Sequence, residues 1–292
     1  MNPLREKMIK MMKLRNCSPR TEQCYLKHIE RISKHYGKSP DKITHEEVQD
    51  FLVMLQVDEK LSFSTCNQIR SAIVFFFRYV LNDKRLDADL PKRKTEKKLP
   101  EILSQEEVFS ILDAVADIRY RLILELIYSA GLRGNEAVNL KVSHIDSKRM
   151  IIRIVQAKGH KDRNVGLSKT VLNSLREYWR IYKPTDYLFP SDCTGKPLHK
   201  STVLKHFSKS KKKAGITKKG GLHMLRHSYA THMLEAGYDI RTIQKLLGHK
   251  DISTTMRYLH LATNPSQVAS PLDMILVKQD SPWEVSDGSS AK

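Results

Sequence analysis

A basic segment bracketed by prolines most constrains how this sequence can fold. Residues 91–100 read Pro-Lys-Arg-Lys-Thr-Glu-Lys-Lys-Leu-Pro and show no apolar periodicity. Proline fixes φ and has no backbone N–H, so regular structure is interrupted at both ends of the segment. A stretch of this composition behaves as a linker rather than as part of a core. We therefore expect folding units at residues 1–88 and 101–270, a linker at 89–100 and a tail at 271–292.

The first unit is predicted to be a small domain of four amphipathic helices, because apolar residues recur at helical spacing in four stretches. Ser18 followed by Pro19 indicates an N-cap and a first helical residue, and Thr44 with Glu47 forms a capping box. The fourth stretch, residues 64–80, contains three consecutive phenylalanines. We interpret these as core residues rather than as a surface that stacks on bases.

The second unit is predicted to combine helices with a small antiparallel sheet. Ser104 and Glu107 form another capping box at its start. Residues 142–167 contain β-branched runs separated by turn residues, which favours strands and a hairpin with Lys158 at its tip. A helix is expected on either side of this region, near 120–130 and 169–182. The predicted fold class is therefore mainly α with a small antiparallel β-sheet.

The last part of the second unit is predicted to return to helices. One begins near Ser201, and two more, at 223–236 and 240–247, are each followed by a glycine at the position where a helix C-cap favours positive φ. A short helix from about Ser253 is expected to carry Tyr258. Beyond it, residues 272–277 include an apolar patch in the tail.

The charge of the chain indicates an anionic partner. Its 51 Lys and Arg outnumber its 32 Asp and Glu, which gives a net charge of +19. Such a surplus attracts polyanions, with nucleic acid as the first candidate and an anionic membrane as the second. Apolar residues make up 40% of the chain, enough for a core. Two basic clusters are expected to contact DNA phosphates. One is in the linker and consists of Lys92, Arg93, Lys94, Lys97 and Lys98, and the other is in the second unit and consists of Lys211, Lys212 and Lys213.

The sequence shows no signal for secretion, for a membrane span or for a metal centre. Residues 1–15 mix charge with methionine, and no stretch approaches the roughly 20 apolar residues of a membrane span. The four cysteines lack C-x-x-C spacing, so we expect reduced thiols in a cytoplasmic protein and neither a metal nor another cofactor. They are Cys17, Cys24, Cys66 and Cys193.

Six residues in a fixed order suggest phosphoryl-transfer chemistry. A phosphodiester gains charge in its transition state, and arginine suits it because its planar fork grips two oxygens and stays charged. Histidines can add hydrogen bonds or move protons, and a lysine on a hairpin tip could protonate a leaving 5′ oxygen. A tyrosine could attack phosphorus and conserve the bond energy in a covalent intermediate. The candidates are Arg133, Lys158, His223, Arg226, His249 and Tyr258.

Each of these residues also has a simpler structural interpretation. Arg133 alone would be a surface ion-pair partner, Lys158 a solvated turn residue and Tyr258 a packed aromatic. His223 and His227 have the spacing of a zinc-protease pair, but Arg226 stands where that motif places its glutamate. The order and spacing of the whole set favour catalysis over these separate interpretations.

The same residues resemble a known family signature. The runs His-Met-Leu-Arg-His-Ser-Tyr-Ala-Thr-His from His223, Leu-Leu-Gly-His up to His249 and Ser-Thr-Thr-Met-Arg-Tyr up to Tyr258 look like those of the tyrosine recombinases, or phage integrase family. Ala-Gly-Leu-Arg133 with Glu136 resembles the first arginine box. Similarity covers most of the chain, and the compact size resembles Xer-type and integron-integrase-type members. No insertion of the integron type is evident before His223.

The resemblance assigns roles to the candidates. It makes Arg133 and Arg226 phosphate-binding arginines, Lys158 the hairpin lysine and Tyr258 the nucleophile, with His223 and His249 as the active-site histidines. It also implies a SAM-like core-binding domain before an α+β catalytic domain, and four protomers that exchange strands of double-stranded DNA without metal or ATP. One departure is the Gly-Asn pair before Glu136, where many members carry a small hydroxyl residue.

Three alternatives remain open on the sequence alone. A type IB topoisomerase-like enzyme would use the same chemistry. A non-catalytic DNA-binding regulator could use the helices at 223–236 and 240–247 as a helix-turn-helix, but it would not need a nucleophile. An RNA-binding protein would explain the charge and not the spacing. The tail at 271–292 is a candidate for docking onto a neighbouring subunit.

Overall fold

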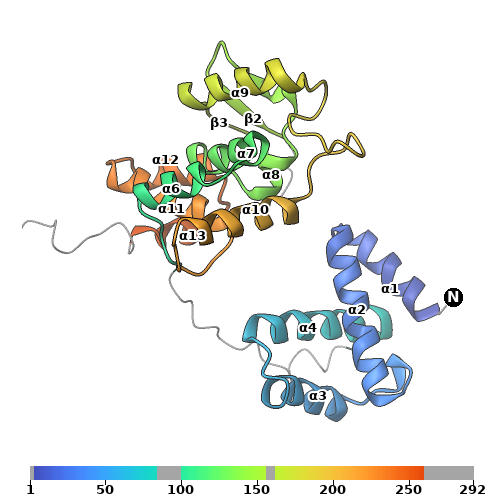
Figure 1. Cartoon of the computed structure of the whole chain (residues 1–292). Coiled ribbons are helices and arrows are strands. Elements are labelled where there is room, and N and C mark those ends of the chain that lie inside the picture. The colour runs from blue at the N-terminus through green and yellow to red at the C-terminus, as the bar shows by residue number, and fades with distance from the viewer. Residues whose placement is uncertain (1–2, 84–99, 156–161, 260–292) are drawn as a thin grey trace, which may run out of the picture. The chain divides into compact units, whose positions relative to one another are not determined.

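The protein forms two compact units, Met1–Lys98 and Leu99–Lys292, in a computed structural model that describes residues 3–83, 100–155 and 162–259 (Figure 1). The predicted linker cations Lys92, Arg93, Lys94, Lys97 and Lys98 lie outside the described residues, as does the tail patch. The residue ranges proposed for the domains and the tail stay predictions.

The first unit consists of helices only within its described residues. Their bounds are α1 (Pro3–Leu14), α2 (Pro19–Tyr36), the short η1 (Pro40–Lys42), α3 (His45–Val57), α4 (Phe63–Phe76) and a turn of π-helix, η2 (Phe77–Leu81). The expected start signals are present. Ser18 caps α2 with proline at its first position, and Thr44 and Glu47 form the capping box of α3.

The three phenylalanines of the first unit are buried, which confirms their interpretation as core. Phe75, Phe76 and Phe77 are 8%, 1% and 5% exposed. Three consecutive residues of a regular helix point in different directions, so all three are covered only if neighbours surround that segment. The chain provides this by continuing α4 into the π-helical turn, with α4 packed against α2 and the π-helical turn packed against α1.

The second unit contains helices and one sheet, which confirms the predicted fold class. It begins with α6 (Gln105–Asp113), capped by Ser104 and Glu107, and continues with α7 (Ile118–Ser129), α8 (Gly134–Val138) and η3 (Val142–His144). The strands β1 (Ile145–Asp146), β2 (Ile151–Ile154) and β3 (Arg163–Gly166) follow. The later helices are α9 (Lys169–Tyr182), α10 (Lys200–Lys213), α11 (His223–Glu235), α12 (Ile240–Leu247) and α13 (Ser253–Met256).

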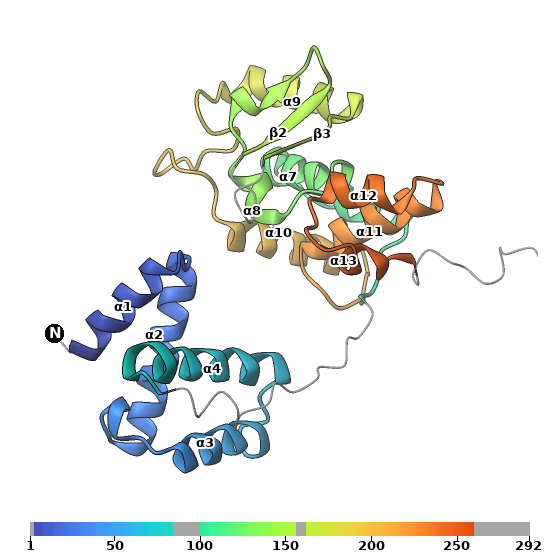
Figure 2. The same ribbon diagram turned by 180° about the vertical axis from the view of Figure 1, so that it is seen from behind.

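The sheet is antiparallel in the order β1–β2–β3, and its register determines which hairpin side chains face the core. Ile152 pairs with Val165 and Ile154 with Arg163, and all three of these apolar residues are buried. Arg153, between the two isoleucines, is exposed because successive side chains of a strand alternate between faces. In both ribbon views β2 and β3 lie between α9 and α7 (Figure 2).

Helix α7 is the centre of the second unit. Six of its twelve residues are buried, and it contacts α6, α8, α9, α10 and α11. Helix α12 contacts α11, α13 and β3. These contacts bring the C-terminal helices, the turn after α7 and the base of the β-hairpin together.

One expectation for the last helix was wrong in detail. Helix α13 ends at Met256, so Tyr258 lies in the turn after the helix and not on it. Its backbone N–H still donates to Thr255 O at 2.9 Å, which continues the helical path locally.

The turn between α7 and α8 provides a test of the packing around the C-terminal helices. Gly131 has φ +62°, and a Cβ there would lie 2.6 Å from the ring of Tyr229 and 2.9 Å from Leu247. Gly131→Ala should lower the free energy of unfolding by about 1–2 kcal/mol for the left-handed backbone, plus about 1–3 kcal/mol for overpacking. Urea unfolding of the full chain measures this through tryptophan fluorescence, because Trp179 lies in α9 of the second unit.

Gly215 is the matched control, since it has φ +72° and nothing within 4 Å of its Cβ position. Gly215→Ala should show the backbone cost alone. Equal losses in the two variants would contradict the close packing of α7, α11 and α12 at Gly131.

Candidate active site

Arg133 is positioned by the first turn of α8. It is the N-cap residue, and Glu136 reaches back so that its carboxylate accepts the Arg133 backbone N–H at 2.8 Å. The same carboxylate accepts Arg133 Nη1 at 2.8 Å. The residue after Arg133 is Gly134, which packs closely against two side chains. A Cβ at this position would lie 3.1 Å from Leu222 and 3.2 Å from Lys200. The glycine that departs from the family pattern therefore allows close packing at this point.

Glu136 is shared by three arginines. Arg163, the first residue of β3, donates Nη1 and Nη2 to its two carboxylate oxygens at 3.0 and 2.7 Å. Arg226 Nη1 lies 3.9 Å from the same carboxylate. The side chains of Glu136, Arg163 and Arg226 are only 9%, 10% and 3% exposed. We call Glu136 with Arg133, Arg163 and Arg226 the arginine cluster.

The arginine cluster also holds the C-terminal end of α12. Arg163 Nε donates to Leu246 O at 2.9 Å, Arg226 Nη2 to Leu247 O at 2.7 Å and Arg133 Nη2 to Gly248 O at 3.4 Å. The last carbonyls of a helix have no partner within it and carry partial negative charge, so cations are favoured there. Three consecutive carbonyls are thus satisfied by three different arginines.

Charge within the cluster alters its ionisation. Burial would raise the pKa of Glu136, but hydrogen bonds from Arg163 and Arg133 outweigh it and lower the pKa to about 2. Burial, and then the charge of Arg133, lower the pKa of Arg226 to about 10. Glu136 is therefore ionised and Arg226 charged at neutral pH. Three positive charges face one negative charge, which leaves the cluster suited to an added anion.

His249 follows α12 directly and joins the same group. Gly248 has φ +63°, and its C-cap turn places His249 Nε2 3.1 Å from Arg226 Nη2. A guanidinium only donates, so Nε2 accepts and the ring proton is on Nδ1, which donates to Thr255 Oγ1 at 2.9 Å. Burial, and then the charge of Arg226, lower the pKa of His249 to about 3. The ring is neutral in this state.

Tyr258 is buried and its hydroxyl is bonded to a histidine. It is 3% exposed within a small cluster with Tyr229, Ile243 and Leu247, and its Oη lies 2.8 Å from His227 Nδ1. Burial, and then the charge of His223, lower the pKa of His227 to about 4, so this ring is neutral as well. Burial raises the pKa of the Tyr258 hydroxyl, whereas the nearby charges of Arg226, Arg257 and Arg133 lower it.

Two predicted site residues remain, His223 and Lys158. His223 is exposed at the start of α11, and partial burial of its ring, then the charge of Lys200, lower its pKa. Its ring centroid lies 6.1 Å from that of His227. Lys158 lies outside the described residues, in the gap between β2 and β3. The structure therefore groups Arg133, Arg226, His249 and Tyr258, with His223 beside them.

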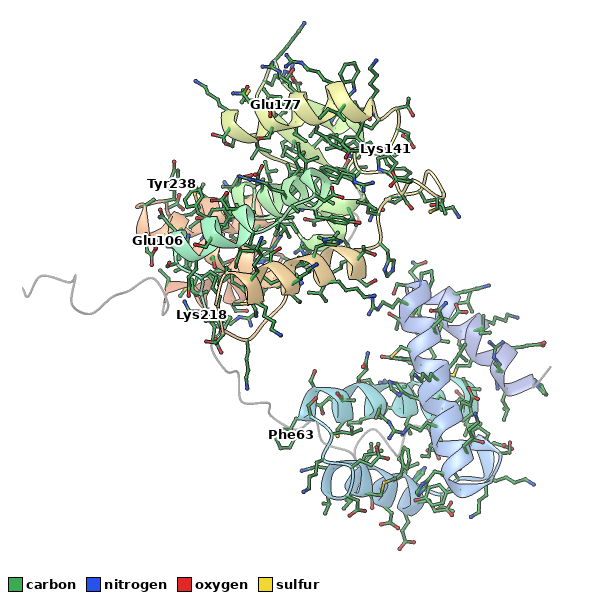
Figure 3. The ribbon with its side chains drawn as sticks, in the orientation of Figure 1. Phe63, Glu106, Lys141, Glu177, Lys218 and Tyr238 are labelled. Carbon is green, nitrogen blue, oxygen red and sulfur yellow. The ribbon has the colours of Figure 1, made fainter. Side chains whose placement is uncertain are left out.

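The predicted basic cluster of α10 is divided by the structure. Lys212 and Lys213 are exposed in the last turn of the helix. Lys211 instead donates its ammonium to the carbonyls of Lys218 and Gly220, so it ties the loop before α11. Lys218, labelled in Figure 3, forms an ion pair with Glu107 of α6. Lys211 therefore bonds to the loop before α11, and its contact with DNA stays a prediction, as it does for Lys212 and Lys213.

Sequence reasoning missed three residues that contact or influence this site. Arg163 belonged to the expected hairpin, His227 was considered only as a partner of His223, and Arg257 stands just before Tyr258. Arg163 had one sequence signal, a cation at the end of the turn-rich stretch after Lys158. The contact between His227 and Tyr258 joins residues 31 positions apart, which no local pattern could reveal.

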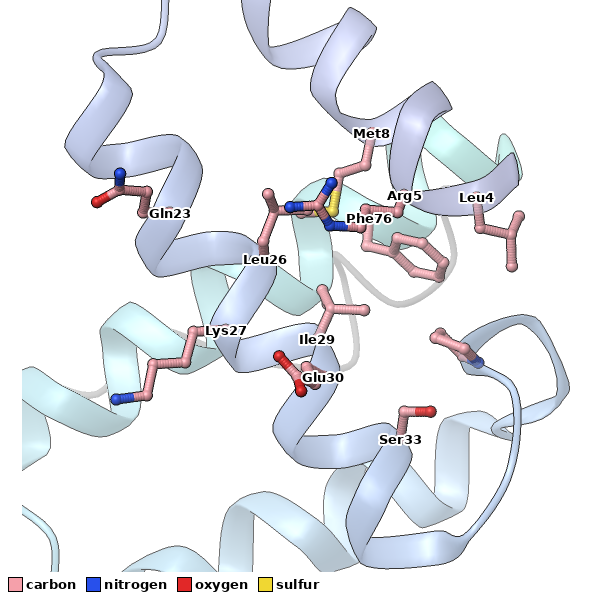
Figure 4. Close-up of a pocket in the computed structure, with 11 residues that line it drawn as sticks. Leu4, Arg5, Met8, Gln23, Leu26, Lys27, Ile29, Glu30, Ser33 and Phe76 are labelled. Carbon is pink, nitrogen blue, oxygen red and sulfur yellow. The ribbon is translucent and has the colours of Figure 1, made fainter. Parts of the chain in front are cut away.

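A cavity elsewhere is unrelated to these residues. It has a volume of about 490 Å³ and lies in the first unit, where α1, α2 and α4 contribute Leu4, Met8, Leu26, Ile29 and Phe76 (Figure 4). None of the six predicted catalytic residues lines it. Among the described residues there is no group of three His, Cys, Asp or Glu side chains arranged for a metal ion. None of the described helices is long and apolar enough to span a membrane.

Comparisons with known proteins match both units. Residues 101–264 match the phage integrase family, and residues 4–86 match the phage integrase N-terminal SAM-like domain. A putative integrase/recombinase of Sinorhizobium fredii is 41% identical, with 94% of this chain and 90% of the relative covered. A tyrosine recombinase of Thermosipho africanus is 32% identical over 85% of this chain and 91% of its own length.

Solved structures are similar over most of the chain as well. The XerH site-specific recombinase, bound to a palindromic difH substrate in a post-cleavage complex, gives a TM-score of 0.66 at 25% identity, with 89% of this chain and 82% of XerH covered. A lambda integrase dimer bound to a core site gives 0.72 at 20% identity, covering 92% of this chain and 98% of that one, and shows the fold alone. By its sequence and its two matched domains, this chain belongs to the phage integrase family.

Proposed function

We propose that this chain is a site-specific tyrosine recombinase that cuts and rejoins double-stranded DNA through Tyr258. The observation that carries the proposal is the arginine cluster. It gathers Arg133 and Arg226 beside His249, and their charges act on the Tyr258 hydroxyl. A fold that only bound DNA would not need a tyrosine within the field of buried, fixed arginines.

In this mechanism Arg133 and Arg226 bind the non-bridging oxygens of the scissile phosphate. Their guanidinium groups are already held by Glu136 and by the carbonyls at the end of α12, so little reorganisation is needed when the transition state gains charge. His249 and His223 add hydrogen bonds to the same phosphate. With its proton on Nδ1, the neutral His249 ring must either release Thr255 and donate from Nδ1, or move the proton to Nε2 and release Arg226.

The covalent step transfers the phosphoryl group to the protein. Tyr258 Oη gives up its proton to water and attacks phosphorus, so that the new O–P bond forms a 3′-phosphotyrosine as the P–O5′ bond breaks. Lys158 gives a proton to the leaving 5′ oxygen. Attack by a 5′ hydroxyl of either strand reverses the step and releases Tyr258, so no ATP is consumed and no metal is required by this chemistry.

In the free protein the Tyr258 hydroxyl is hydrogen-bonded to His227. The hydroxyl must leave that contact before it attacks, because the side chain is buried and its oxygen is held by this hydrogen bond. We propose that DNA binding moves the segment around Tyr258, which lies after the short helix α13.

The solved relatives indicate the assembly. Lambda integrase has been solved as a dimer on a core site and as a tetramer on a Holliday junction. We propose that this chain likewise acts as a tetramer on two DNA sites, in the cytoplasm. Lys212 and Lys213, together with the linker cations, would contact the phosphate backbone.

The nucleophile is tested by covalent trapping. The probe is a pool of duplexes that carry one nick within a randomised segment, so that the short leaving strand diffuses away after cleavage. Wild-type protein should form an SDS-resistant adduct on a subset of the pool, and sequencing of that subset gives the target site. Tyr258→Phe should bind the recovered duplex and form no adduct, because it lacks the attacking oxygen.

Tyr79 of the first unit provides the matched control, and Tyr79→Phe should trap DNA as the wild type does. Equal trapping by Tyr258→Phe and wild type would overturn the assignment of the nucleophile. Relaxation of any supercoiled plasmid, whatever its sequence, would instead favour the topoisomerase-like alternative.

The neutral histidines predict a pH dependence of stability. The folded pKa of His227 is about 4 and that of His249 about 3, against an ordinary value of 6.5. As pH falls below 6.5, the unfolded chain takes up protons at these positions that the folded chain does not. The free energy of unfolding should therefore decrease from pH 6.5 towards pH 4, by up to about 1.4 kcal/mol per pH unit for each histidine.

Urea unfolding at several pH values, read by tryptophan fluorescence, measures the slope. His227→Gln removes one titrating group and should make the slope shallower. His199→Gln, at an exposed histidine outside the predicted site residues, provides the control variant. A slope unaffected by His227→Gln would show that His227 is not held neutral against Tyr258.

A further inference from the structure

We infer that Arg163 is a positioning residue of the active site, which holds Arg133, Arg226 and His249 in place from the base of the β-hairpin. It is not among the six residues to which the phosphoryl-transfer chemistry is assigned. The inference concerns the free protein and goes beyond the proposed function. The measurements on DNA below depend on that function, and the hydrogen-exchange measurement does not.

All three guanidinium nitrogens of Arg163 donate hydrogen bonds. Nη1 and Nη2 bind the two oxygens of Glu136 side by side, at 3.0 and 2.7 Å, and Nε points to Leu246 O at 2.9 Å. Bidentate arginine–carboxylate pairs fix orientation as well as distance. A lysine has one charged nitrogen and cannot hold a carboxylate and a carbonyl in this fixed geometry. The residue type at position 163 therefore matters, and not only its charge.

Through Glu136, Arg163 acts on both phosphate-binding arginines. Glu136 bonds to the backbone and side chain of Arg133 and lies 3.9 Å from Arg226. Among the groups that lower the Glu136 pKa, Arg163 contributes most, through its side-chain hydrogen bonds. Loss of Arg163 would leave a buried carboxylate with fewer partners, and Arg133 would follow the displaced Glu136.

Through α12, Arg163 acts on His249. Its Nε–H holds Leu246 O, one residue before the carbonyl that binds Arg226 and three before His249. A Cβ at Gly248 would lie 2.9 Å from Arg163 Cδ, so the glycine allows the arginine stem to pack against the C-cap. The same side chain thus fixes the end of α12 and the turn that directs the His249 ring.

Its place in the chain links these contacts to the hairpin. Arg163 begins β3, in register with Ile154 at the end of β2. Lys158 belongs to the segment between these strands. One residue therefore anchors the hairpin that carries the proposed proton donor to the cluster that binds the phosphate.

The test uses Arg163→Met, which keeps an unbranched stem but removes the charge and the hydrogen-bond donors, and Arg163→Lys, which keeps the charge. Arg153→Met is the matched control, because Arg153 is an exposed arginine of the same hairpin, on β2. With protein in excess over the duplex recovered by trapping, Arg163→Met should slow adduct formation by about 100-fold, as expected for a small displacement of catalytic groups. DNA affinity should change little, Arg163→Lys should recover only part of the rate, and Arg153→Met should react as the wild type.

A double-mutant cycle with Glu136→Gln separates positioning from a general loss of structure. If Arg163 acts through Glu136, the two substitutions together should cost far less than the product of their separate effects. The acid side of the rate–pH profile should also move to higher pH in Arg163→Met, because the Glu136 pKa rises without its partner. Independent effects, or a loss of DNA affinity equal to the loss of rate, would overturn the inference.

Hydrogen exchange of the full-length free protein tests the same contacts without DNA. Arg163→Met should speed exchange in peptides that cover residues 244–256, where the amides of Gly248 and His249 close the end of α12. Exchange in α9 should stay unchanged, and Arg153→Met should alter neither region. Unchanged exchange at the end of α12 would contradict the inference even if no DNA target were found. Failure of wild-type trapping with altered exchange would count against the proposed function alone.

Discussion

The carboxylate of Glu136 is the contact on which the rest of the site depends. It is nearly buried and lies between three guanidinium groups, two of which it binds directly. Without it, three like charges would face one another in a region of low dielectric, which is costly. With it, the cluster keeps a surplus of positive charge that is stable in the fold and available to a phosphate. The protein therefore does not assemble its cation site around DNA but folds with that site already formed.

The helix end next to Glu136 completes this arrangement. Each carbonyl from Leu246 to Gly248 accepts an N–H from a different arginine. The carbonyls at the end of α12, which lack partners within the helix, are thus hydrogen-bonded, and the arginines gain acceptors. The glycine at 248 is required twice, for its positive φ and for the approach of Arg163. His249 leaves this turn towards Arg226, and Tyr258 packs against Leu247 and the inner face of α11. The geometry of the candidate catalytic groups follows from one cluster and one helix end.

Much of the fold could be predicted because its signals are local. The caps at Ser18, Thr44 and Ser104 and the glycines that end α11 and α12 each act within a few residues. Family membership came from the order of the motif residues. The roles of Arg163 and His227 could not be predicted, since their partners Glu136 and Tyr258 are 27 and 31 positions away and meet only after α7, β3 and α11 pack. The sequence also did not predict that α13 ends at Met256, before Tyr258. Tyr258 packs against residues of α11 and α12, which are distant in the sequence.

The most direct test of this account is the ionisation of Glu136 in the free protein. Its carboxyl carbon can be followed by NMR over a pH series and assigned by its absence in Glu136→Gln. Glu136 should stay ionised as pH is lowered, with a pKa of about 2, for as long as the protein remains folded. A midpoint near 4.5, the ordinary value for glutamate, would show that the arginines do not hold this carboxylate and would contradict the central claim.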